Sequence, residues 1–184
     1  MPNYCDYDMK IRGSKKAINR VLNCLQADYD YDKGRPAHKH FFRVFDATLS
    51  EHTHIRKVGD NVYEAYVFGY CAWSVWSCMC SGDSTYYSSV KKDYPSTFMG
   101  TTLLEQSRDC EIEVFSEEPG IGFSEHYIFK NGHCYCDDTC KIECAGYDEN
   151  DKPTTDLDWD TYYGDTITKN PHRKNFYGDY AWEL

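Results

Sequence analysis

The sequence lacks several features that would assign a function directly. It has no run of about 18 apolar residues, the length that a membrane-spanning helix needs. Its opening, Met1-Pro2-Asn3-Tyr4-Cys5-Asp6, contains no apolar h-region, so we expect no signal peptide. A glycine-rich phosphate loop, a nucleophile elbow and an HExxH motif are also absent. The sequence therefore predicts a cytoplasmic, non-enzymatic protein that does not insert into a membrane.

The composition is that of a folded, acidic protein. The 184 residues are 41% hydrophobic and 16% aromatic, which is enough to form the core of one domain. The net charge of −10 disfavours direct nucleic-acid binding, because neutralisation of phosphates supplies most of that affinity. The same charge suits a basic protein surface, including one that holds nucleic acid. Such a surface is the partner that we expect, and a homo-oligomer is compatible with the sequence.

The ten cysteines have two interpretations. Without a secretion signal, a reducing compartment and free structural thiols are expected. Alternatively, four thiolates close together in sequence would suit a structural zinc ion. The candidates for this site are Cys134, Cys136, Cys140 and Cys144. The usual CxxC spacing is missing, so both interpretations stay open, and no cofactor other than zinc is considered.

Hydrophobic periodicity predicts the order of the secondary-structure elements. Period-two alternation indicates strands at residues 6–11, 40–49, 110–115 and 123–129, and the apolar run at 62–80 also favours a strand. Helical spacing follows a candidate N-cap at Ser14, and a second helix is expected at residues 101–108. Asn131-Gly132 predicts a tight turn into a hairpin with residues 133–136.

Residues 114–127 form the most chemically dense stretch of the sequence. Pro119 should end one strand, and two following glycines permit a tight turn before the next. The turn is expected to bring Glu117, Glu118, Glu125 and His126 into one small region. A binding or metal site is one interpretation of this stretch, and an acidic hairpin on a solvated surface is the other.

Three motifs resemble a known family. They are Met1-Pro2-Asn3-Tyr4-Cys5, Ala72-Trp73-Ser74 and Glu118-Pro119-Gly120-Ile121-Gly122-Phe123. Together they are similar to the YubB-type ferredoxin-like proteins of phages, plasmids and other mobile elements. The resemblance and the order of elements imply an α+β fold, a ferredoxin-like split β-α-β sandwich with two helices on one face of an antiparallel sheet. Residues 1–136 would form this domain with its added hairpin.

Residues 137–184 are predicted to form an acidic C-terminal extension. They contain 12 acidic and 5 basic residues, a net charge of −7. The residues that we expect to contact a partner are Glu117, Glu118, Glu125, Asp156, Asp158, Trp159, Asp160, Tyr162, Tyr163 and Asp165. Aspartates would steer association with a basic surface, and aromatic side chains would anchor it. Alternatively, this segment packs on its own sheet and its charges are merely solvated.

Two functional hypotheses follow. The first is a phage or mobile-element accessory protein that binds and inhibits a host protein, most plausibly as an anti-CRISPR-type inhibitor of a defence nuclease. Its acidic surface would mimic nucleic acid in the cytoplasm of an infected bacterial cell. The alternative is a metal-dependent or zinc-stabilised nucleic-acid processing protein, in which carboxylates or thiolates hold a metal.

Overall fold

The structure is a computed structural model. It describes residues 4–26, 29–30, 32–33, 35–50, 54–80, 92, 99–144, 167–169 and 172. Every structural statement refers to these residues. Their architecture is of the α+β class, with a mostly antiparallel open sheet and few helices. Among the described residues, no helix is long and apolar enough to cross a bilayer.

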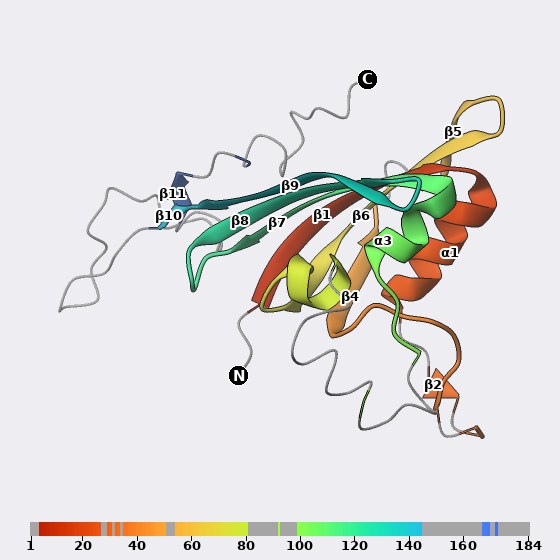
Figure 1. The fold of residues 1–184 in the computed structure, drawn as a ribbon, viewed down its shortest axis with the longest axis horizontal. Coiled ribbons are helices and arrows are strands. Elements are labelled where there is room, and N and C mark those ends of the chain that lie inside the picture. Colours follow the sequence, from red (N-terminus) through yellow and green to blue (C-terminus); the bar gives the residue numbers. More distant parts are fainter. Residues whose placement is uncertain are drawn as a thin grey trace.

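A seven-stranded sheet forms the body of the protein (Figure 1). Its strands follow the order β4-β6-β1-β7-β8-β9, and β5 also pairs with β6. The bounds are β1 Tyr4–Gly13, β4 Val44–Leu49, β5 Arg56–Gly59, β6 Val62–Ala72, β7 Cys110–Glu118, β8 Phe123–Lys130 and β9 His133–Lys141. Two small pairs lie outside this sheet: β2 (Tyr29–Asp30) with β3 (Arg35–Pro36), and β10 (Glu143–Cys144) with β11 (Ile167–Lys169).

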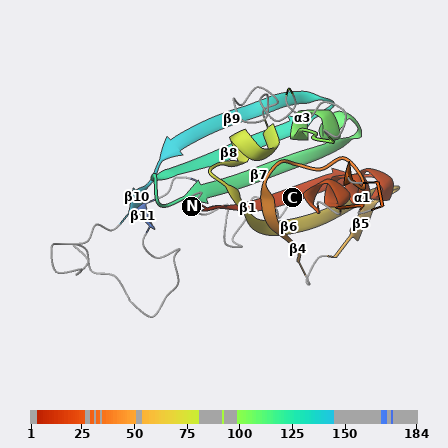
Figure 2. The same ribbon diagram turned by 90° about the horizontal axis from the view of Figure 1, so that it is seen from below.

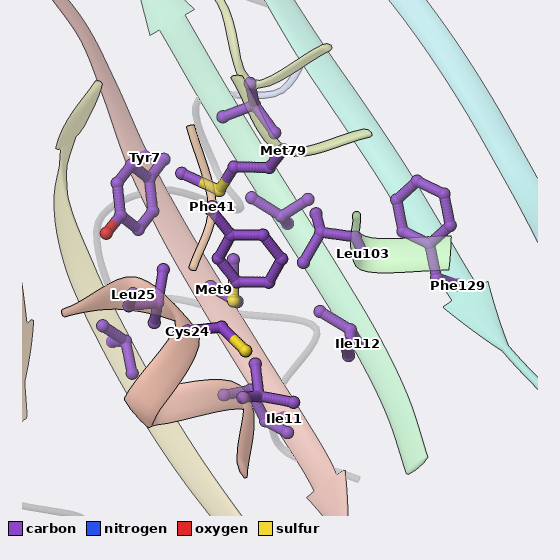
Figure 3. Packing of buried hydrophobic residues seen from close by; sticks show 14 of the residues in the cluster. Tyr7, Met9, Ile11, Cys24, Leu25, Phe41, Met79, Leu103, Ile112 and Phe129 are labelled. Carbon is purple, nitrogen blue, oxygen red and sulfur yellow. The ribbon is translucent and has the colours of Figure 1, made fainter. Parts of the chain in front are cut away.

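Alternation along β1 separates a core face from a face that we call the outer face. Tyr7, Met9 and Ile11 point into the core, where each is almost completely buried. They pack with residues from the helices and from the neighbouring strands (Figure 3). Burial of an apolar side chain of this size contributes about 2 kcal/mol relative to its exposure. The intervening residues Asp6 and Asp8 lie on the outer face, as the period of two requires.

The helices cover the core face (Figures 1 and 2). Helix α1 (Lys15–Leu25) begins after Ser14, whose side chain accepts the N–H of Ala17 at 3.2 Å, so the predicted N-cap is confirmed. The second predicted helix is shorter than expected: α3 (Leu103–Gln106) continues as a 3₁₀ turn, η2 (Ser107–Asp109). A π-helical turn, η1 (Trp76–Cys80), completes this layer.

Two predicted strands are too long because tertiary contacts end them. In the 40–49 stretch, the N–H of Phe41 bonds the carbonyl of Cys24, so β4 begins only at Val44. In the 62–80 stretch, β6 ends at Ala72 because Trp73 adopts a φ of 66° and turns the chain into η1. The predicted hairpin at Asn131-Gly132 is present. Strand β9 continues to Lys141, so the sheet crosses the domain boundary expected after Cys136.

Gly69 allows β4 and β6 to approach each other at the bulge in β4. The register shifts between Val44 and Asp46, and Gly69 lies opposite Ala47. A Cβ atom on Gly69 would lie 2.0 Å from the carbonyl oxygen of Asp46 and 2.9 Å from the hydroxyl of Tyr7. That hydroxyl donates to the same carbonyl at 2.8 Å. Gly69 therefore occupies a close backbone contact that leaves no room for a side chain.

We predict that Gly69→Ala lowers the free energy of unfolding by about 3 kcal/mol or more, because the new methyl group would displace β4. The matched control is Gly59→Ala in β5, where the new Cβ would have Val62 as its nearest neighbour at 3.6 Å. The control should change stability by no more than about 0.5 kcal/mol. Urea denaturation followed by circular dichroism measures both. Equal unfolding midpoints for the two variants would contradict the close contact.

Candidate protein-docking face

A group of exposed aromatic side chains lies on the outer face where β1 begins. Tyr4, Phe45 and Tyr70 are 55%, 44% and 37% exposed, although their rings touch one another. The Tyr4 ring centroid is 5.8 Å from that of Phe45 and 5.3 Å from that of Tyr70. Phe68 precedes Tyr70 by two positions and is also exposed. We call these four residues the aromatic patch. Contiguous exposed apolar surface of this kind marks interaction sites.

The bulge in β4 explains why the aromatic patch includes Phe45. Tyr70 pairs with Asp46, and Cys71 pairs with Val44, so Phe45 is the extra residue of the bulge. Its ring meets Tyr4 and Tyr70 on the outer face instead of entering the core. A strict period of two gives no indication of this placement, because an inserted residue changes the face on which following side chains lie.

Two carboxylates border the aromatic patch on β1. Asp6 pairs with Tyr70 and Glu117, and Asp8 pairs with Phe68 and Phe115. Burial raises the pKa of Asp8 to about 7, and the nearby charges of Glu117 and Asp6 add to the effect. Burial also raises the pKa of Asp6. Among the described residues, neither aspartate forms an ion pair with a cationic side chain. This edge of the outer face therefore combines exposed aromatic rings with two carboxylates that have no ion-pair partner among the described residues.

The predicted acidic surface at residues 114–127 is corrected by the structure. Glu117, Glu118 and Glu125 are only 1%, 2% and 3% exposed. Glu125 lies opposite Ser116 on the core face, Glu118 folds back onto the turn, and Glu117 lies opposite Asp6 and Ser124 on the outer face. These three side chains consequently do not present their carboxylates on a surface, and the expected convergence of all four ionisable groups does not occur.

Glu118 stabilises the turn between β7 and β8. Its carboxylate accepts the N–H of Gly120 at 3.1 Å and also the N–H of Ile121. Gly122 has a φ of 88°, a conformation that favours glycine. Gly120 is not among the described residues with positive φ, so only the second glycine of the turn is required by backbone geometry.

Glu125 joins β8 to the chain that follows β6. Its carboxylate accepts the N–H of Val75 at 2.9 Å and that of Trp76 at 3.4 Å, at the start of η1. The hydroxyls of Ser116 and Tyr127 donate to it at 2.6 and 3.1 Å. Burial raises the pKa of Glu125, while these four donors act in the opposite direction. Glu125 thus caps a helical turn that is 50 residues away in sequence.

His126 points to the outer face, whereas Glu125, its neighbour in the sequence, points to the core face. Its Nε2 lies 2.9 Å from Glu113 Oε1, and its ring stacks on Phe115 with centroids 4.0 Å apart. Its Nδ1 lies 3.5 Å from the Sγ of Cys136. The sequence places Glu113 and Cys136 on different strands, so only the pairing of β7, β8 and β9 brings these groups together.

The predicted C-terminal extension contacts its own sheet at His172, which sequence reasoning did not identify. His172 is buried, and its Nδ1 lies 2.9 Å from the hydroxyl of Ser124. Its Nε2 lies 3.1 Å from Asp138 Oδ2, and Cys140 Sγ is 3.7 Å from Nδ1. Strands β10 and β11 both belong to the predicted extension, and they pair with each other outside the main sheet. The other predicted contacts, Asp156, Asp158, Trp159, Asp160, Tyr162, Tyr163 and Asp165, lie outside the described residues.

His126 and His172 each lie between a carboxylate and a thiol or hydroxyl, as the histidine of a catalytic triad does. Neither arrangement contains an activated nucleophile. Ser124 is completely buried, so a substrate has no access to its hydroxyl. Burial raises the pKa of the Cys136 and Cys140 thiols, and the charge of Asp138 raises both further. A reactive cysteine needs the opposite shift. The contacts therefore pack His126 and His172 onto the sheet.

Two of the four candidate zinc ligands, Cys134 and Cys136, lie on opposite faces of the sheet. The register shifts between Ile128 and Phe129, so Cys136 pairs with Ile128 on the outer face while Cys134 pairs with Phe129 on the core face. Within the described part of the chain, no group of three or more His, Cys, Asp or Glu side chains is placed to hold a metal ion. Cys134, Cys136 and Cys140 are free thiols.

Comparison with known proteins gives no relative from which to transfer a function. No family model, no curated protein and no solved structure matches the chain. The similarity to YubB-type proteins stays a prediction that rests on its three motifs. The function has to be argued from the geometry of the residues.

We predict that Asp8 makes stability depend on pH. Its pKa is about 7 in the folded protein and 3.8 ordinarily, so the folded state binds this proton more tightly. The resulting stabilisation is complete below about pH 4 and is lost as the pH rises through about 7. Asp8→Asn should remove this loss and be more stable than the parent by about 1 kcal/mol at about pH 8.

The control for this prediction is Asp60→Asn, on the exposed turn between β5 and β6. Thermal denaturation across the pH range, for the parent and both variants, measures the effect. If the thermal stability of Asp8→Asn and of Asp60→Asn depends on pH as that of the parent does, the environment of Asp8 does not disfavour its charge.

Proposed function

We propose that this protein is a non-enzymatic binding protein that docks its aromatic patch, with Asp6 and Asp8, on a basic surface of another protein. The observation that carries the proposal is the group of exposed, mutually contacting rings beside two carboxylates that form no ion pair with a cationic side chain among the described residues. Exposed aromatic side chains supply most of the energy in protein interfaces, and charges supply specificity and rate.

The partner's positive charge follows from the electrostatics of β1. Asp8 is partly buried and close to Glu117 and Asp6, so its ionised form is disfavoured in the isolated protein. An arginine or lysine from a partner would stabilise that charge while it covers the rings. A surface that normally binds phosphates has the required charge, and nucleic acid would compete for it.

The biological setting of the proposal comes from the resemblance. The antiparallel order β4-β6-β1-β7, with α1 after β1 and α3 before β7, is compatible with a ferredoxin-like split β-α-β core. Together with the three motifs, it supports a mobile-element origin. We infer that the partner is a host protein with a nucleic-acid-binding channel, such as a CRISPR-type defence nuclease, and that docking inhibits it. The alternative of a metal-dependent processing protein has no supporting cluster within the described residues.

The test compares three immobilised proteins that differ in one surface each. The patch variant carries Tyr4→Ser and Tyr70→Ser, and the control carries Tyr135→Ser, which removes a 65% exposed tyrosine from β9. We expect the parent and the control to retain the same host protein from lysate, and duplex DNA or RNA to release it. The patch variant should fail to retain it. Equal retention by all three would contradict the proposed surface.

Kinetics with the purified partner would separate the two kinds of contact. Asp6→Asn with Asp8→Asn should slow association and reduce its salt dependence, because these charges act at long range. The patch variant should instead speed dissociation, by about thirtyfold if one ring is a hot spot. If neither change alters a rate constant, the partner binds elsewhere on the protein.

A further inference from the structure

A second candidate site lies at the same end of the sheet, on the side of η1. It is an open pocket of about 470 Å³ between η1, the β7–β8 turn and β9. Its walls are largely aromatic, and its polar lining includes two carboxylates as well as the hydroxyls of Ser74 and Thr139. The residues that matter here are Trp73, Trp76, Phe123, Glu125, Tyr127 and Asp137. None of the contacts of the aromatic patch involves this pocket.

The pocket walls expose aromatic faces because the chain reverses after β6. Trp73 takes its φ of 66° where β6 ends, and Trp76 begins η1 and remains exposed. The Trp76 ring lies 5.8 Å from that of Tyr127, tilted by 32°. The faces of aromatic rings carry partial negative charge, and indole is the strongest of them for binding a cation.

The two acidic groups of the pocket are the carboxylates of Glu125 and Asp137. Glu125 is almost completely buried, yet all four of its contacts are neutral hydrogen-bond donors. Among the described residues, no lysine, arginine or histidine forms an ion pair with it. Asp137, opposite Tyr127 on β9, adds an exposed negative charge. Buried charges in proteins are usually paired, whereas neither carboxylate of this pocket forms an ion pair with a cationic side chain among the described residues.

We propose that the pocket binds an arginine side chain of the basic partner. The planar guanidinium stacks on indole and donates hydrogen bonds to carboxylates, which matches both kinds of group present. The chain uses the same interaction nearby, where the Arg43 guanidinium lies 4.5 Å from the Trp73 ring centroid and 5.9 Å from that of Phe45. Arg43 also links the pocket to the aromatic patch. This inference rests on the proposed function only in assigning the arginine to the basic partner protein.

The experiment uses two peptides that differ by one charge. Ac-Gly-Arg-Gly-amide is titrated into the full-length ¹⁵N-labelled protein, and the indole N–H resonances of Trp73 and Trp76 are followed by NMR. The matched probe contains citrulline, a neutral isostere of arginine. The arginine peptide should give saturable shifts, and its Kd should be lower than that of the citrulline peptide by about fivefold or more. Equal binding of both peptides, or no saturable shift with either, would overturn the proposal.

Variants locate the binding within the protein. Trp76→Leu and Asp137→Asn should each raise the Kd of the arginine peptide by about fivefold, because each removes one attraction to the cation. Tyr135→Leu and Asp60→Asn are the matched controls and should leave it unchanged. The patch variant should also retain peptide binding, so the pocket and the docking face are tested separately. Unchanged binding in both Trp76→Leu and Asp137→Asn would contradict the assignment to this pocket.

Discussion

The hydrogen bonds of the Glu125 carboxylate hold together the end of the protein where both candidate surfaces lie. Because two backbone N–H groups of η1 and two hydroxyls from β7 and β8 converge on it, this one side chain fixes the chain after β6 against the sheet. Backbone donors at the start of a helical turn have no partner within that turn, so they require an outside acceptor. A buried carboxylate meets that need and leaves a negative charge without a cation beside it among the described residues.

Both sides of this end of the sheet combine aromatic rings with carboxylates. On the outer face, the aromatic patch adjoins Asp6 and Asp8. On the side of η1, indole and phenol rings surround Glu125. The guanidinium of Arg43 contacts rings of both groups. Rings with nearby carboxylates attract cations, so both sides suit a partner rich in arginine, and both would repel a nucleic acid.

The sequence predicted the strands and the helix that are determined by local periodicity. Alternation located β1, β7 and β8, and apolar spacing with Ser14 located α1. The prediction from sequence failed where a single inserted residue, or a contact between positions far apart in sequence, determines the structure. The extra residue Phe45 and the shift after Ile128 change the face of side chains, and a pattern with a period of two cannot register such insertions. Similarly, periodicity does not reveal that Glu117 is buried, and the contacts of His172 join positions far apart in sequence. The aromatic patch was missed because its rings come from three strands, whereas Glu-rich and Asp-rich runs are visible in the sequence.

The most direct test is a titration of Glu125 itself. Its carboxyl ¹³Cδ shift can be followed by NMR over the acidic and neutral pH range, together with hydrogen exchange of the Val75 and Trp76 amides. We predict that Glu125 titrates above the ordinary pKa of a glutamate, because burial disfavours its charge. Protonation should also reduce the protection factors of the two amides, because a neutral carboxyl is a weaker acceptor. An ordinary pKa, with amide protection that does not change across the titration, would contradict the central role of this carboxylate.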